Sequence, residues 1–296
     1  MKTQIQTKAD GKMIMEIITL NAMLMKAWGA SVSVLNSAFM SAFLSSLAGA
    51  SLGVLGAQRV SERAARRKEL RDALNQSNAL VVLATTIANQ ALSTKNQHIS
   101  PLSKTFFLDR KEAEKKNEAI ISGGPATGHI HFRAEMVHIT PLTVPIEALK
   151  SLTFVSQLVP GKALALAAMI EQSLTELGHA VSMRATQIEL LRGREMSPDV
   201  FMQTYFGLRR ADGSIDSMYH DTMVAISQYT DDVAFFSSEF AEELQLHASR
   251  VRDKLLLITK DVGKVSNVDF SEARNSGILP PRANYESWLR GFKNQE

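Results

Sequence analysis

The sequence contains no cysteine, and its 296 residues include only 8 prolines, 16 glycines and few aromatic residues. The absence of cysteine excludes disulfide scaffolds, thiol nucleophiles and cysteine-ligated zinc or iron–sulfur centres. Scarce proline and glycine disfavour a loop-rich or all-β chain, whereas abundant alanine, leucine and methionine favour helices. The balance of apolar and charged residues excludes general disorder. We therefore expect a mainly α-helical protein.

Positive charge is concentrated in one short segment. Between residues 59 and 71 there are six basic and two acidic residues, so this segment alone exceeds the net charge of +3 of the whole chain. The basic residues are Arg59, Arg63, Arg66, Arg67, Lys68 and Arg71. A nucleic-acid-binding domain usually spreads its positive charge over a folded surface. The sequence therefore predicts no nucleic-acid partner.

The longest uncharged run covers residues 27–58, which is 32 residues. As a helix it would be about 48 Å long, more than the ~30 Å hydrocarbon thickness of a bilayer. Trp28 stands near one end, where an interfacial aromatic residue is expected, and basic residues follow the other end. We predict a single transmembrane helix over residues 30–57, preceded by an amphipathic segment over residues 1–29.

The basic residues that follow this predicted span also set its orientation. Because lysine and arginine accumulate on the cytoplasmic side of a span, residues 59–296 are expected in the cytoplasm and the N-terminus outside. The predicted location is the inner (plasma) membrane, with lipid as a partner. Small residues recur every fourth position at Ser45, Gly49, Gly53 and Ala57. This stripe would let two membrane helices approach closely, so a homo-oligomer is one open alternative.

A helical bundle is predicted over residues 58–262, continuing directly from the span. Apolar residues repeat at helical spacing up to Ser100 and Pro101, which are expected to end the first long helix. Near-heptad spacing over residues 214–261 favours coiled-coil-like packing. Residues 122–145 break the helical pattern and alternate like strands, so they predict a small β insertion that carries recognition. Residues 263–296 read as a tail with a short helix.

The best candidate metal ligands lie in this insertion. His129 and His131 would point to one face of a strand, with His138 nearby, so three imidazoles could meet as in a zinc site. The only acidic residue close by is Glu135, and an uncoordinated cluster is the favoured interpretation. No nucleophile, base or phosphate-binding motif has the required spacing. We therefore predict no cofactor and no enzymatic activity.

Three functions remain compatible with this pattern. The first is a membrane-anchored scaffold or sensor that binds a protein partner at the cytoplasmic surface. The second is a pore-forming or membrane-perturbing effector, since serines and Asn36 give the span a polar side. The third is a soluble, all-helical interaction protein in which residues 27–58 form a buried core helix.

Overall fold

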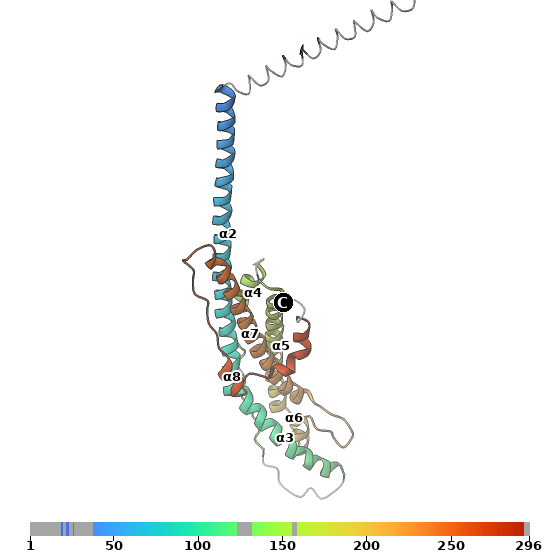
Figure 1. Ribbon diagram of the computed structural model, residues 1–296. Coiled ribbons are helices and arrows are strands. Elements are labelled where there is room, and N and C mark those ends of the chain that lie inside the picture. Colours follow the sequence, from blue (N-terminus) through green and yellow to red (C-terminus); the bar gives the residue numbers. More distant parts are fainter. Residues whose placement is uncertain are drawn as a thin grey trace, which may run out of the picture. The chain divides into compact units, whose positions relative to one another are not determined.

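The structure is a computed structural model that describes residues 19, 22, 23, 26, 38–122, 132–155 and 159–292. The chain divides into two units, Met1–Arg66 and Arg67–Glu296. The helices are α2 (Ala38–Thr94), the π-helical turn η1 (Lys95–Ile99), α3 (Ser100–Ile121), α4 (Ile146–Val155), α5 (Gly161–Gly193), α6 (Pro198–Phe206), α7 (Met218–Leu256), α8 (Ser271–Asn275), the 3₁₀ turn η2 (Arg282–Tyr285) and α9 (Glu286–Arg290) (Figure 1). The predicted mainly α-helical class is confirmed.

The second unit is built around the long helices α5 and α7, which form its most extensive helix pair. Helix α7 directs Ile226, Val233 and Phe240 inward at intervals of seven residues, and none of the three is exposed. These side chains join apolar residues of α5 and of the last turns of α2 in one core. The near-heptad spacing therefore reflects a buried seam, as predicted.

A single π turn joins α2 to α3 without interrupting the helical course. Buried residues recur every seven positions at Ser77, Ala84 and Ala91, and again at Ile99, Phe106 and Ala113, but eight residues separate Ala91 from Ile99. The turn absorbs the additional residue, so both series stay on the buried side. The sequence analysis expected the helix to end here, yet Pro101 lies in the first turn of α3, where a missing N–H is tolerated.

The predicted β insertion over residues 122–145 is not supported. Residues 123–131 lie outside the described part of the chain, and residues 132–145 contain no strand. Among the described residues, the only β pairing is an isolated bridge between Arg209 and Ile215. The alternating pattern marks an extended segment. Side chains that project from neighbouring helices, and not a second strand, bind the backbone of this segment.

The predicted transmembrane helix over residues 30–57 also receives no support. Across the helical residues that the structure describes, none forms a stretch long and apolar enough to cross a membrane. Ser45 and Ser46, together with Gly49 and Gly53, interrupt the apolar residues of α2 and lower its mean hydropathy.

The C-terminal segment is held against α7 by charged groups. Glu239 is only 4% exposed and lies 3.1 Å from the Arg282 guanidinium and 4.0 Å from that of Arg274. Nearby, the Tyr285 hydroxyl donates to Asp232 at 2.7 Å, and its ring stacks on Phe235. Burial raises the pKa of Glu239 despite both arginines, because desolvation outweighs their attraction.

This buried carboxylate predicts a pH dependence of stability. Above the ordinary glutamate pKa of 4.5, the folded chain retains a proton that the unfolded chain has lost. The free energy of unfolding should therefore fall as the pH rises from 4.5 through the raised pKa. Glu239→Gln should flatten this decline in urea titrations across that range, whereas Glu286→Gln, at an exposed position, should leave it unchanged. An equal slope in both variants would contradict the assignment.

Candidate functional site

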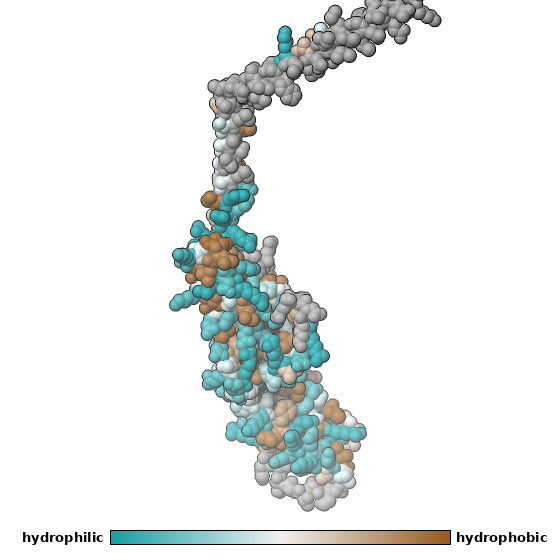
Figure 2. Space-filling view, in the orientation of Figure 1, coloured by the Kyte–Doolittle hydropathy of each residue, from teal (hydrophilic) through white to brown (hydrophobic). Residues whose placement is uncertain are grey.

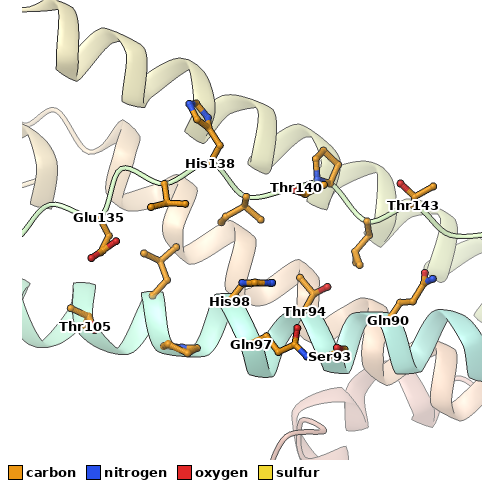
Figure 3. Close-up of a pocket in the computed structure, with 16 residues that line it drawn as sticks. Gln90, Ser93, Thr94, Gln97, His98, Thr105, Glu135, His138, Thr140 and Thr143 are labelled. Carbon is orange, nitrogen blue, oxygen red and sulfur yellow. The ribbon is translucent and has the colours of Figure 1, made fainter.

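A cleft of about 690 Å³ lies between a helical wall and an extended segment of the second unit. The helical wall comes from the end of α2, the π turn and the start of α3, and the other wall is residues 135–143. Figure 3 shows the segment running alongside the helices, with Glu135 near Thr105 and Thr143 near Gln90. The volume is in the range of known ligand sites.

The two walls have matching lengths. Fifteen helical steps from Gln90 to Thr105 cover about 22 Å. Eight steps separate Glu135 from Thr143, and a fully extended chain would cover them in about 26 Å. An extended backbone can therefore follow the whole helical wall, and Figure 3 shows the segment running alongside it.

The helical wall is polar because its residues come from the side of the helix that faces away from the core. Gln90, Ser93, Gln97 and His98 are exposed and line the cleft. Gln97 and His98 belong to the π turn, which forms where Pro101 cannot donate an N–H to the carbonyl of Gln97. Turns of this kind are frequent at functional sites, where they reshape one helical surface.

Arginine side chains of α5 bind the backbone of the extended segment. Arg184 is 1% exposed, and its two terminal nitrogens donate to the carbonyls of Val137 at 2.6 Å and Glu135 at 2.7 Å. Arg192 donates to the carbonyl of Met136 at 2.9 Å. A guanidinium presents several donors in a fixed fork, so Arg184 can take two carbonyls that a neighbouring strand would otherwise bind.

Two tyrosines complete this attachment. The N–H of Glu135 donates to the Tyr205 hydroxyl at 3.2 Å, and the Tyr219 hydroxyl donates to the Glu135 carbonyl at 3.3 Å. Burial raises the pKa of Tyr205, so the hydroxyl stays protonated at physiological pH. The Arg184 guanidinium also lies 5.7 Å from the Tyr219 ring. Helices α5, α6 and α7 together fix the start of the segment.

The cleft carries little charge. Among the described residues that line it, Glu135 alone has a formal negative charge, and none is a lysine or arginine. Figure 3 shows its carboxylate directed toward the helical wall and the His138 ring directed away from it. The His138 imidazole lies 3.3 Å from Glu189 of α5. The cleft thus combines neutral hydrogen-bonding groups, apolar patches and one anionic end.

Of the three candidate metal ligands, only His138 belongs to the described part of the molecule. His129, His131 and the interfacial Trp28 lie outside the described residues. Among the residues described, no three histidine, aspartate or glutamate side chains are close enough to hold a metal ion. His138 is half exposed beside Glu189.

The predicted membrane and interaction residues of α2 are mostly exposed, and Arg71 alone among the described ones forms an ion pair. Within the described part of α2, the residues of the small-residue stripe are exposed, and a Cβ at Gly49 or Gly53 would meet nothing within 4 Å. The basic residues from Arg59 to Lys68 are exposed and make no ion pair with any described residue. Arg71 differs, because it pairs with Asp261 at 2.8 Å.

Sequence reasoning located one wall of the cleft and missed the other. It assigned recognition to residues 122–145, which contribute Glu135 to Thr143. The helical wall was not identified, since exposed glutamines and serines resemble an ordinary solvated face. Pro101 inside a continuing helical pattern was the available signal for the π turn.

Comparison with protein-family models, curated proteins and solved structures found no match.

Proposed function

We propose that this protein is a non-enzymatic, membrane-anchored scaffold whose helical bundle binds a protein partner. The observation that carries the proposal is the exposure of α2. Every described side chain from residue 42 to residue 69 is exposed, including Leu47 at 56% and Val54 at 66% (Figure 2). Helices in water owe most of their stability to packing of an apolar face, so this helix needs an external cover.

Lipid is the cover that fits the chain best. The described helical residues alone do not form a stretch long and apolar enough to cross a membrane. In the sequence, however, the uncharged run extends back to Ala27, ahead of the start of α2 at Ala38. The exposed basic residues after Gln58 suit anionic headgroups, at about 1 kcal/mol for each residue near the surface. They would also keep residues 59–296 in the cytoplasm.

Membrane fractionation tests the anchor. We expect the full-length chain to resist extraction by carbonate and to dissolve in detergent. Leu47→Lys combined with Ala50→Lys should release it, because each buried lysine costs about 2.5–3.5 kcal/mol near the middle of a span. Val60→Lys combined with Ala64→Lys adds the same charge on the exposed basic part of α2 and should leave the protein in the membrane.

The two lysine pairs separate the competing explanations. A wild-type chain that is soluble without detergent would overturn the anchor. Release by both pairs would show that any added positive charge weakens association, which contradicts a specific apolar segment.

The partner-binding part of the proposal rests on the cleft in the second unit. Its lining offers hydrogen-bonding groups from Gln90, Ser93 and Thr143 without an arrangement of nucleophile and base, which suits binding better than catalysis. A protein partner is therefore the favoured occupant class.

A further inference from the structure

We propose that the cleft binds an extended, neutral-to-basic peptide segment of a partner protein, which adds as a strand to residues 138–142. This inference rests on the proposed partner-binding function and names the chemistry of the partner. Four observations support it: free backbone groups, the course of the segment along the cleft, the polar opposite wall and the sign of the charge.

The free backbone groups are the strongest of these. No hydrogen bond within the described chain involves the N–H or C=O groups of residues 138–143. Immediately before them, the carbonyls of residues 135–137 are all occupied by side chains. An extended backbone with unpaired donors and acceptors is a template for a further strand.

The alternation of an extended chain indicates which groups are available. Alternate residues direct their N–H and C=O groups to the same edge. At residues 135–137 both edges are occupied, since Arg184 binds the carbonyls of Glu135 and Val137 and Arg192 binds that of Met136. Beyond residue 137, His138, Thr140 and Leu142 share one edge, and Pro141, which has no N–H, belongs to the other. The proline therefore removes no donor from the edge that we assign to the peptide.

The remaining features select the kind of peptide. The segment follows the cleft over eight residue steps, enough to pair with a peptide of six to eight residues. Glutamine, serine and threonine of the helical wall can bind side chains or backbone of such a peptide without demanding charge. Within the described lining, Glu135 supplies the one formal charge, which favours a lysine or arginine at that end and disfavours acidic peptides.

Selection from a phage-displayed library of random 12-residue peptides, with the full-length chain as target, tests the inference. We expect enriched sequences to contain an extended stretch with a basic residue, and a synthetic copy of the best sequence to bind in solution. Ser93→Trp, which fills the cleft from an exposed helical position, should weaken this binding at least tenfold. Ala79→Trp is the matched control, since it is also exposed on α2 but lies about 21 Å earlier.

Three further readouts are specific to strand addition. Glu135→Gln should weaken binding of the basic peptide. It should also reduce the preference of the protein for this peptide over a version in which acidic residues replace the basic ones. Two further peptides are N-methylated at alternate residues, one at the odd and one at the even positions. One of the two should bind at least tenfold more weakly than the unmethylated peptide. Bound peptide should slow hydrogen exchange at the amides of His138, Thr140 and Leu142.

Several outcomes would overturn the proposal. The first is a peptide that binds the Ser93→Trp variant as tightly as the wild type. The second is equal binding of the two N-methylated peptides. The third is a selection in which the wild type enriches no peptide beyond those that the Ser93→Trp variant enriches. None of these measurements depends on lipid. A chain that resists carbonate but selects no peptide overturns the cleft inference alone, whereas a soluble chain that selects peptides overturns only the anchor.

Discussion

Replacing Arg184 with methionine is expected to lower the free energy of unfolding by about 2–4 kcal/mol. The variant loses two hydrogen bonds from a charged donor to the carbonyls of Glu135 and Val137, and the contact with the Tyr219 ring. Hydrogen bonds to charged groups contribute about 1.5–3 kcal/mol each, and burial of the charge offsets part of that sum. Urea denaturation of the full-length chain measures the difference.

Two other variants identify the cause of this loss. Arg184→Lys keeps the charge but loses the fork, so it should be destabilised as well. Arg192→Met removes a bond to the neighbouring carbonyl of Met136 from a half-exposed side chain, and it should cost less than about 1 kcal/mol. A stable Arg184→Met protein would show that desolvation of the buried guanidinium outweighs its hydrogen bonds. Hydrogen exchange in residues 135–143 should increase in the destabilised variants.

Phe106→Ala should destabilise the bundle by about 3–5 kcal/mol. Phe106 of α3 is 2% exposed, and its ring lies 5.4 Å from those of Tyr205 and Phe206 and 5.9 Å from that of Tyr219. Truncation removes apolar contacts and leaves a cavity beneath the tyrosines that hold Glu135. The midpoint and slope of a urea titration give the loss.

Phe154→Ala on α4 is the matched control for this truncation. Its ring is 54% exposed, so the same chemical change should cost less than about 1 kcal/mol. Similar losses at the two positions would mean that the aromatic cluster around Phe106 contributes no more than an exposed ring, contrary to its packing.

Most helices were predictable because their signals are local. Ser197 and Pro198 predicted the start of α6, and the Ser197 side chain does accept a hydrogen bond from the N–H of Val200. Gly207 ends the same helix with a φ of 64°, a conformation that glycine adopts without strain. Apolar spacing predicted the long helices α5 and α7 in the same way.

The pairing of the extended segment was not predictable from such signals. Alternation along residues 132–145 indicates an extended backbone but not the group that binds it. That group is Arg184, which lies 47 residues after Val137 on a helix and reads as an ordinary polar residue. The cleft likewise depends on two segments whose proximity only the packing of the bundle establishes.

The π turn gives the helix tolerance to a loss of one residue at residues 95–98. Each residue of an α-helix rotates the following ones by about 100°. Deleting one residue here would restore the seven-residue spacing after Ala91 in a plain α-helix, so Ile99, Phe106 and Ala113 would still face the core. The same deletion earlier in α2, with the π turn kept, would turn these three side chains away from the core together. A deletion within the turn should therefore remove the bulge and preserve the packing of the bundle.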